Sequence, residues 1–381
     1  MALIGDGENW TPLRQARADL GWKVSQLIAA LRRCAARTNV ALGSDKSLKT
    51  TVSRHENGHI HPSDEWRYLY RLVYGRTDEE LGFADPSDRY DEPTPIDDLR
   101  QRLATSSRVD MPLVREMEKQ VHQIRLLDRR LGAPSLLEQT RAVMATLDEL
   151  MSHSVRPSIR SALAAVLADA ATLAAWQALD VGALGQAWHH YETAKVAARE
   201  AESRVLLAHA MGEQVYALHD LGRLTDAVTL VEGAVTTVKR NGPPLLNCWL
   251  RAVEGEVHAK LGDDECHRAL ERSVELLPAD PDDPRLPFIS LNEAHLARWR
   301  GHCLAHLGQP EAVDYLRRAV DGMDSSFVRA AAGLRCDLAQ ALFSCGEVDE
   351  ARVHLRTARS LANQVGSVRQ RRRILNLGRV A

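Results

Sequence analysis

The amino-acid sequence predicts an all-α protein, with a small N-terminal helical domain at residues 1–83 and an α-solenoid at residues 166–381. Three observations support this prediction. Apolar residues in the N-terminal segment recur every three to four positions, as on one face of a helix. An acidic, Pro-rich linker at residues 84–110 separates this segment from further helical patterns. From about Leu167 the chain then repeats a pair of helical stretches, which is typical of stacked repeats.

Composition sets limits on function. Hydrophobic residues make up 45% and charged residues 26% of the 381 residues, which is ordinary for a globular protein. Because the net charge is −2, nucleic-acid binding would require a local basic surface. No apolar run approaches the roughly 18 residues of a membrane span, and Met1–Gly7 begins no signal peptide, so we expect a cytoplasmic protein. The six cysteines form no Cys-x-x-Cys pair and are expected to be reduced.

The N-terminal domain is predicted to be a set of short helices. Thr11-Pro12 starts the first, because proline suits the first helical position, and Gly21 ends it. The second begins at Val24 and keeps an apolar face for about three turns. Further elements are expected at Ser47–Gly58, at Ser63–Tyr74 and, as a last short helical turn, at Asp78–Phe83.

The stretch Ser47–Gly58 has a face for a core and a face for a polar partner. Ser47 is a favourable N-cap, Leu48 and Val52 lie one turn apart, and Asn57-Gly58 forms a C-cap. Short polar and basic side chains fill the remaining positions. Residues 23–61 carry a net charge of +5, whereas residues 84–98 carry −5. We therefore interpret the stretch as a DNA-recognition helix in a basic neighbourhood.

Several short motifs in this domain resemble a known family. They are Gly21-Trp22, Leu27-Ile28, Ser47-Leu48-Lys49, Ser53-Arg54, Glu56-Asn57-Gly58, Tyr74-Gly75-Arg76-Thr77 and Glu80-Leu81-Gly82-Phe83. Together they resemble the lambda-repressor/Cro-type (XRE-like) helix-turn-helix of bacterial transcriptional regulators, and more closely its variant fused to tetratricopeptide repeats. In that family the helix that matches Ser47–His55 enters the major groove of double-stranded DNA. The DNA-binding residues implied by the resemblance are Lys23, Lys46, Ser47, Lys49, Thr50, Thr51, Ser53 and Arg54.

The resemblance also implies structural roles and shows two departures. Glu56 would be an orienting carboxylate and Gly58 a left-handed turn. The family's usual Ser-Gln opening falls on Lys23-Val24, so the phosphate-binding glutamine is missing, and the frequent Trp before Glu-Asn-Gly is His55. These departures leave open that Ser47–Gly58 is a capped surface helix that does not read DNA.

Residues 111–165 are predicted to form a connecting helical hairpin. One apolar stripe runs from Val114 to Leu131 and stops at Gly132, and Leu136–Met151 is the expected antiparallel return. The hairpin is either a dimerisation element or packs against its own chain.

The remainder of the chain carries five degenerate repeats. Short turns are marked at spacings of 40, 40, 46 and 38 residues by Gly182, Gly222, Gly262, Gly308 and Gly346. Small side chains precede these glycines by seven residues, with one valine among them, at Ala175, Val215, Gly255, Gly301 and Ala339. A small–large–small pattern follows each glycine, as in Ala187, Tyr191 and Ala194. The repeats resemble tetratricopeptide repeats, which stack because no helix pair alone buries its apolar face.

The first helix of each pair is expected to line a concave surface. The effector-binding residues predicted on it are Trp176, His209, Tyr216, His219, Trp249, Glu256, His295, Arg298 and His302. Aromatic and polar side chains together suit a groove for a peptide or small ligand. The alternative is that Trp176 and Trp249 pack between repeats and that the histidines are solvated. His302 and His306 lack a third metal ligand, so we expect no metal or other cofactor. The basic tail 369–373 is expected to be a charged cap on the solenoid.

Three functional hypotheses follow. The first is a cytoplasmic transcriptional regulator, a homodimer on DNA whose solenoid senses an effector; related repeat-containing regulators imply a peptide. The second is a tetratricopeptide-repeat interaction scaffold that reads DNA weakly or not at all, as Lys23-Val24 and His55 suggest. The third is an enzyme with an unrecognised site. Since the sequence shows no Gly-rich phosphate loop, nucleophile elbow or paired catalytic carboxylates, we expect no enzyme.

Overall fold

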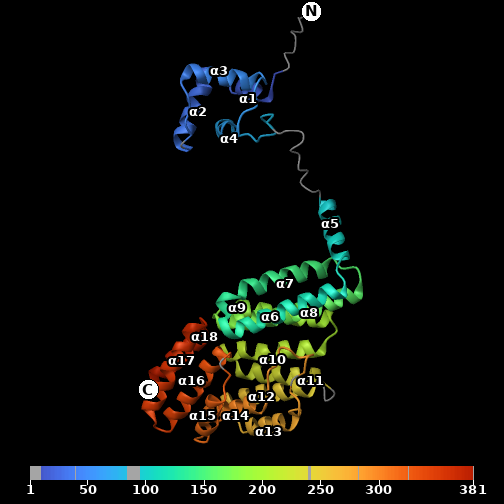
Figure 1. The fold of residues 1–381 in the computed structure, drawn as a ribbon, viewed down its shortest axis with the longest axis vertical. Helices are drawn as coiled ribbons and strands as arrows, with labels where there is room; N and C mark the ends of the chain where they lie inside the picture. The colour runs from blue at the N-terminus through green and yellow to red at the C-terminus, as the bar shows by residue number, and fades with distance from the viewer. Residues whose placement is uncertain are drawn as a thin grey trace, which may run out of the picture. The chain divides into compact units, whose positions relative to one another are not determined.

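The protein is all-α in the part of the chain that the structure describes. The computed structural model describes residues 10–38, 40–83, 95–238, 242–281, 283–324 and 326–380. These residues form α-helices and one short 3₁₀ helix, with no strand among them (Figure 1). The chain divides into two compact units, the N-terminal unit Met1–Asp98 and the repeat unit Leu99–Ala381.

Four helices build the N-terminal unit. They are α1 (Pro12–Asp19), α2 (Val24–Thr38), α3 (Asp45–Glu56) and α4 (Asp64–Tyr74). Their apolar faces meet in one core, whose fully buried members include Leu27, Leu48, Val52 and Tyr70. The segment 78–83 is a turn rather than a helix, but its Leu81 and Phe83 are buried in the same core, as the sequence pattern predicted.

Helix α3 begins three residues before its predicted start. Ser44 is the N-cap, and its hydroxyl accepts a hydrogen bond from the backbone N–H of Ser47 at 3.4 Å. Ser47 therefore lies inside the first turn and does not cap the helix. The predicted C-terminal end is confirmed, because Asn57 is the C-cap and Gly58 has a φ of +70°.

The predicted linker at residues 84–110 is too long. Residues 84–94 lie outside the described residues, but α5 (Pro95–Ser107) occupies most of the rest. Proline stands at the start of this helix, and Asp97 and Asp98 follow in its first turn, where negative charge complements the helix dipole. The sequence therefore carried a helix start inside the Pro- and Asp-rich segment.

The repeat unit is an α-solenoid of tetratricopeptide-like helix pairs. Five antiparallel pairs are α8 (Pro157–Asp180) with α9 (Leu184–Glu200), α10 (Arg204–Asp220) with α11 (Leu224–Val238), α12 (Pro244–Leu261) with α13 (Glu265–Leu276), α14 (Glu293–His306) with α15 (Ala312–Asp321), and α16 (Val328–Ser344) with α17 (Val348–Gln364). The flanking elements are α6 (Met111–Leu131), η1 (Ala133–Ser135), α7 (Leu137–Ser152) and α18 (Val368–Val380). The turn between the helices of each pair has a glycine at positive φ, as the repeat spacing predicted.

Small residues mark the points where the two helices of a pair approach most closely. A Cβ atom added to Gly301 would lie 2.7 Å from Cγ of Leu316, and one added to Gly255 would lie 3.1 Å from Cγ of Leu270. Both leucines are the large members of the small–large–small pattern and are buried. The sequence pattern therefore identified the contact between the helices of a pair correctly.

Helix α8 corrects the expectation that no apolar run is long enough for a membrane span. By length and composition alone this 24-residue helix would pass as one, but 83% of its most apolar window is buried inside the repeat unit. It packs against α6, α7, α9 and α10, and is therefore the central helix of the solenoid core. A core helix that is covered on all sides is apolar all round for the same reason as a membrane helix.

The two ends of the solenoid meet. Helix α18 contacts α8, and the chain before it passes so close to η1 that a Cβ on Gly132 would collide with the carbonyl oxygen of Val365 (Figure 1). The hydroxyl of Ser367 donates a hydrogen bond of 2.5 Å to the buried carboxylate of Asp180. The repeat unit therefore closes on itself, with the last helix against the first repeat.

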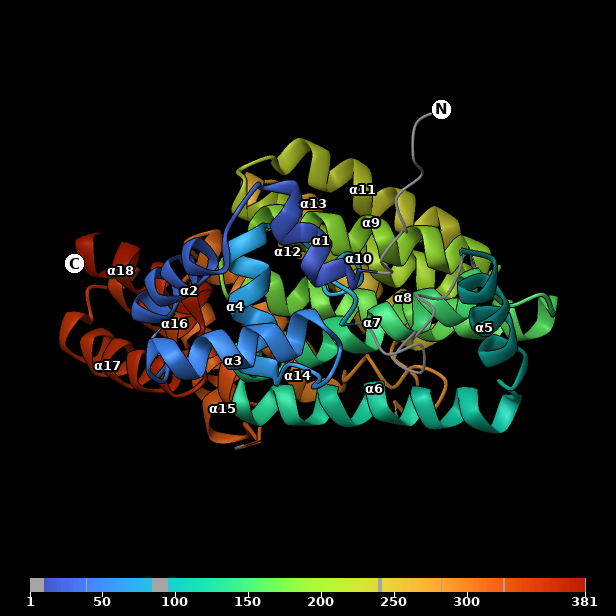
Figure 2. The same ribbon diagram turned by 90° about the horizontal axis from the view of Figure 1, so that it is seen from above.

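Helix α6 belongs to this closed structure rather than to a separate hairpin. It runs lengthwise along the repeats, packs mainly on α8 and contacts α16, whereas its contact with α7 is small (Figure 2). The predicted hairpin at residues 111–165 is thus wrong in its packing, although both helices exist. The cause is long-range, since the partner of α6 at α16 is about two hundred residues away in sequence.

Candidate functional site

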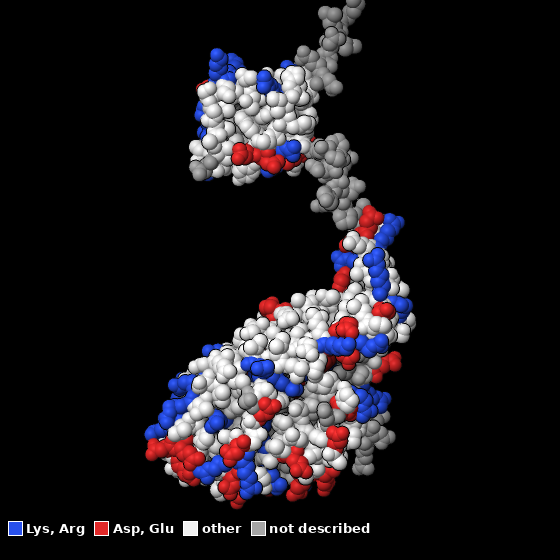
Figure 3. Space-filling view, viewed as in Figure 1, with Lys and Arg blue, Asp and Glu red and all other residues white. Residues whose placement is uncertain are grey.

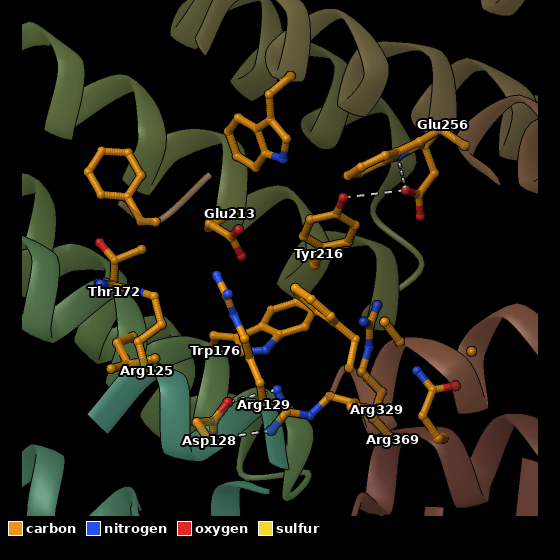
Figure 4. A pocket seen from close by; sticks show the side chains of 18 of the residues that line it. Arg125, Asp128, Arg129, Thr172, Trp176, Glu213, Tyr216, Glu256, Arg329 and Arg369 are labelled. Atoms are coloured by element: carbon orange, nitrogen blue, oxygen red, sulfur yellow. Dashed lines mark hydrogen bonds and ion pairs between the residues drawn. The ribbon is translucent and has the colours of Figure 1, made fainter. Parts of the chain in front are cut away.

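A pocket of about 330 Å³ lies inside the closed repeat unit. Side chains of α6, α8, α10, α12, α14, α16 and α18 line it, together with Phe288 and Phe327 from connecting segments. Figure 4 shows Arg125 and Thr172 on one side and Tyr216 and Glu256 on the other, with Glu213 between them. Each of the five helix pairs therefore presents its first helix to this space, whereas no residue of the second helices, α9, α11, α13, α15 and α17, lines it.

Seven of the nine effector residues predicted from the sequence line the pocket. They are Trp176, His209, Tyr216, Trp249, Glu256, Arg298 and His302. The other two do not. The ring of His219 packs edge-on to Tyr216 and lies 3.2 Å from Nζ of Lys260, while His295 packs against Phe327. Both residues occur at the position in the repeat that the sequence predicted, but neither lines the cavity.

The sequence analysis did not predict most of the positive charge that lines the pocket. Five further arginines line the pocket: Arg125 and Arg129 on α6, Arg329 on α16, and Arg369 and Arg373 on α18. Helix α6 was expected outside the solenoid, and the tail 369–373 was expected to be a solvated cap. The i, i+4 spacing of each pair placed both arginines on one helix face, but the sequence could not show which face turns inward.

Aromatic rings form much of the wall. Trp176 and Tyr216 meet edge to face with ring centroids 5.7 Å apart, and the guanidinium of Arg369 lies 5.7 Å and 5.5 Å from these two rings. The imidazole of His209 packs 4.1 Å from the ring of Phe288. Burial lowers the pKa of His209 to about 3, so this side chain is neutral at physiological pH.

Glu256 is the centre of a buried polar network. Its carboxylate accepts hydrogen bonds from the hydroxyl of Tyr216 at 3.4 Å and from the indole N–H of Trp299 at 3.2 Å. His302 lies between Glu256, at 3.3 Å, and Asp337, at 2.7 Å. Burial alone would lower the pKa of His302, but the two carboxylates raise it. Burial alone would raise the pKa of Glu256, but the nearby charges of His302 and Lys260 hold it well below its usual range. The opposite charges of the network therefore favour one another's ionised forms.

Three of the missed arginines form ion pairs with carboxylates of other helices. Arg329 binds Asp128 at 2.9 Å on α6 and Asp180 at 2.9 Å on α8. Arg369 pairs with Asp220 at 3.0 Å, and Arg373 pairs with Asp337. The pairs of Arg329 and Arg369 join the last helices to α6, α8 and α10, whereas the pair of Arg373 joins α18 to α16. Together they hold the wall of the pocket.

A second group of charges lacks such partners. Arg129 and Arg298 form no ion pair with a carboxylate of the described residues and face Phe327 at 4.8 Å and Trp299 at 5.2 Å. Arg125 binds Asp169 through Nη2, but its buried Nη1 has no hydrogen-bond partner. Oε2 of Glu213 is also unpartnered, and burial raises the pKa of this carboxyl to about 7. Buried polar groups without partners are costly and are typical of sites that await a ligand.

The described residues provide no group of three or more His, Cys, Asp or Glu side chains that could hold a metal ion. His302 and His306 are neighbours, with ring centroids 4.6 Å apart, but burial lowers the pKa of His306 to about 2 while His302 is engaged by Glu256 and Asp337. The pocket chemistry is therefore that of arginines, carboxylates and aromatic rings.

The predicted DNA-binding residues lie on the outer side of α3 and at the start of α2. Thr51 is half-buried, whereas the other seven, Lys23, Lys46, Ser47, Lys49, Thr50, Ser53 and Arg54, are exposed. In the view of Figure 3, blue residues of the N-terminal unit lie along the edge that carries α2 and α3.

Two residues behind this surface have structural contacts. Glu56 is buried and accepts two hydrogen bonds from Arg17, at 2.6 Å and 2.9 Å, which fixes α3 against α1. Nδ1 of His55 lies 3.1 Å from the hydroxyl of Tyr70, and burial lowers the pKa of this imidazole. The orienting role expected for Glu56 therefore has a direct geometric basis.

No protein-family model and no curated protein matches the chain. The solved structures with a similar fold include the following three. A Rap protein complexed with competence and sporulation factor is 15% identical, covers 91% of this chain and 99% of its own, and has a TM-score of 0.44. Aspartyl phosphate phosphatase F from Bacillus subtilis is 13% identical, covers 96% and 98%, and has a TM-score of 0.44. BtubC (BKLC) from P. vanneervenii is 15% identical, covers 62% and 92%, and has a TM-score of 0.40.

Proposed function

We propose that the protein is a cytoplasmic, ligand-responsive regulator. In this proposal the repeat unit binds an effector, either a peptide, a small molecule or a segment of a partner protein, inside its closed pocket. The N-terminal unit binds double-stranded DNA through α3, as a homodimer. The role is binding rather than catalysis.

One observation carries the proposal. The repeat unit encloses about 330 Å³ between aromatic rings and buried charges, and several of these charges have no partner in the described part of the protein. Pockets for small ligands have this size and combination, with apolar walls and a few placed polar groups. Inter-repeat packing alone would favour side chains that satisfy one another, as Arg329, Asp128 and Asp180 do.

The ligand-binding half is tested by a thermal-shift screen of the full-length protein against short peptides and small metabolites. A ligand should raise the melting temperature of the wild type and not that of Trp176→Ala. Exposed Trp188→Ala is the control for loss of an indole, and its response should equal that of the wild type. If Trp176→Ala melts far below the wild type without any ligand, Trp176 is a packing residue. Arg298→Ala, which breaks no ion pair, then serves as the pocket variant.

The DNA-binding half is supported by the exposed side of α3. Lys46, Lys49 and Arg54 project from it without an ion pair to any described residue, so their charges are available to phosphates. A genomic pull-down should recover specific DNA with the wild type and lose it with Lys49→Ala/Arg54→Ala. The matched control Arg115→Ala/Lys119→Ala removes the same charge from an exposed part of α6. Equal recovery with all three proteins would refute DNA binding through α3.

The second candidate function is an interaction scaffold whose N-terminal unit reads no DNA. The burial of His55 favours it, because this side chain packs 5.1 Å from Trp66 and is unavailable to any DNA contact. Exposed Lys23 in place of the family's serine, followed by Val24 in place of glutamine, favours it as well. Absence of salt-sensitive DNA binding by the wild type, together with a ligand response of the repeat unit, would support this candidate.

A further inference from the structure

The charge of the pocket is unbalanced on one side. Arg329, Arg369 and Arg373 are each neutralised by carboxylates of neighbouring helices. Arg129 and Arg298 have no carboxylate partner among the described residues, although both are only partly exposed. A guanidinium stays charged at any physiological pH, so these two groups present positive charge to the cavity.

A third arginine turns an open donor to the same space. Arg125 is 7% exposed and uses Nη2 to bind Asp169, which leaves its buried Nη1 without a partner. Arg125 and Arg129 lie one turn apart on α6, so they share the face of the helix that meets the pocket. Arg298 reaches the pocket from α14. Burial, together with the nearby charges of Arg298 and Arg129, lowers the pKa of His295 to about 4.

The carboxylates of the pocket do not compensate this charge. Asp128, Asp169 and Asp337 already bind arginines, and Glu256 binds Tyr216, Trp299 and His302. Glu213 alone is left, and its carboxyl is 19% exposed with a pKa raised to about 7 by burial. At neutral pH it therefore carries only part of a negative charge.

We propose that the effector carries a carboxylate on an aromatic or apolar body, and that Arg129, Arg298 and the free Nη1 of Arg125 bind this carboxylate. The inference rests on the proposed function of the pocket as a ligand site and specifies its ligand chemistry. The apolar body lies against the rings of Phe327, Trp176 and Trp249, which line the same cavity. Arginines in a partly desolvated site bind carboxylates through short, charge-assisted hydrogen bonds.

The size of the cavity leaves two sources for the carboxylate. About 330 Å³ accommodates a compact aromatic acid or the last residues of a peptide that ends in an aromatic side chain. Both present the same chemistry to the arginines. The two sources differ in whether a peptide bond precedes the aromatic group, and matched probes separate them.

The test is isothermal titration calorimetry of the full-length protein with two acid and amide pairs. The small-molecule pair is 3-phenylpropionate and 3-phenylpropionamide; the peptide pair is Ala-Phe and Ala-Phe amide. At least one acid should bind about tenfold or more tightly than its amide, because the amide loses the charge-assisted hydrogen bonds. The pair that shows this preference identifies the source.

Variants then assign the preference to the arginines. Arg129→Gln and Arg298→Gln should each reduce the acid preference about tenfold, whereas Arg130→Gln, an exposed neighbour on α6, should keep it. Melting curves of the three variants serve as the control for folding and should match that of the wild type. Failure of both acids to bind at millimolar concentration, equal binding of acid and amide, or an unchanged preference in Arg129→Gln and Arg298→Gln would overturn the carboxylate site.

These failures are distinguishable from failure of the proposed function. If the amides bind as well as the acids and Trp176→Ala abolishes both, the pocket is a ligand site without carboxylate specificity. If no probe binds and the thermal-shift screen also yields no ligand, both proposals fail together.

Discussion

The pocket of the repeat unit and the outer side of α3 both carry unpaired positive charge, but they differ in burial. Arg125 is almost fully buried, and its unpartnered Nη1 therefore lowers the stability of the folded protein. Lys49 and Arg54 are exposed and are satisfied by water. The comparison teaches that an unpaired buried charge points to a ligand, whereas an unpaired exposed charge is compatible with one and does not require it.

The largest effect should come from removing a buried, paired charge. Arg329→Ala leaves Asp128 and Asp180 buried without their cation, which should destabilise the repeat unit by about 3–5 kcal/mol. Arg32→Ala breaks the exposed pair with Asp45 in the N-terminal unit and should cost less than about 1 kcal/mol. Urea denaturation monitored by circular dichroism gives both values. Similar losses in the two variants would mean that the ion pairs of the closed ring are no more important than surface pairs.

A smaller effect should come from the close approach of the repeat helices. Gly301→Ala places a methyl group 2.7 Å from Cγ of Leu316, so the two helices of that pair must separate, at a cost of about 1–3 kcal/mol. Gly185→Ala on α9 meets nothing within 4 Å and should be neutral or stabilising by up to about 1 kcal/mol. The melting temperature should fall in Gly301→Ala and should stay the same or rise in Gly185→Ala. A destabilised Gly185→Ala with an unaffected Gly301→Ala would contradict the assignment of the helix contacts.

The unpartnered carboxyl in the pocket should make stability depend on pH. Burial raises the pKa of Glu213 from 4.5 to about 7, against the effects of Arg369 and Arg125 and with a small contribution from Glu256. Since the folded-state pKa is the higher one, the stability that Glu213 contributes is complete below pH 4.5 and is lost as the pH rises through 7. Glu213→Gln should therefore gain on the order of 1–2 kcal/mol relative to the wild type between pH 5 and pH 8.

The measurement is the difference in free energy of unfolding between Glu213→Gln and the wild type at several pH values. This difference cancels the titration of other groups. A difference that stays constant from pH 5 to pH 8 would show that Glu213 titrates normally.

Substitutions on the exposed side of α3 should have the smallest effect on stability and the largest effect on DNA binding. Lys49→Ala/Arg54→Ala should change the free energy of unfolding by less than about 0.5 kcal/mol per site. If the DNA-binding proposal holds, the slope of log K against log salt should decrease by about 2, one for each lost phosphate contact. Fluorescence anisotropy with recovered DNA measures this slope. Weaker binding with an unchanged slope would mean that neither side chain contacts a phosphate.

Much of the repeat unit could be predicted from the sequence, because its determinants are local. Gly182 and the other turn glycines need positive φ, and Gly301 and Leu316 must fit each other within one helix pair. These requirements recur along the chain and are therefore visible in it. The start of α3 was misplaced by three residues because Ser44 and Ser47 are equally suitable caps.

The closed ring and half of the pocket could not be predicted in this way. The pair of Arg329 with Asp128 joins residues about two hundred positions apart, and no local pattern indicates it. From the sequence alone, where the contact between the first and last helices is not visible, Arg129 and Arg369 are interpreted as solvated charges on helix surfaces. Seven of the nine predicted residues line the cavity because they follow the spacing of the repeats, whereas His219 and His295 follow the same spacing and are not among the residues that line it.

Calorimetric titration of each acid and its amide into the wild type and Arg129→Gln tests most directly whether unpaired buried arginines mark a carboxylate site. The wild type should bind one acid, 3-phenylpropionate or Ala-Phe, about tenfold more tightly than the matching amide, and Arg129→Gln should bind the two alike. Two results would contradict the account. The wild type could bind acid and amide equally well, or Arg129→Gln could keep the preference of the wild type for the acid.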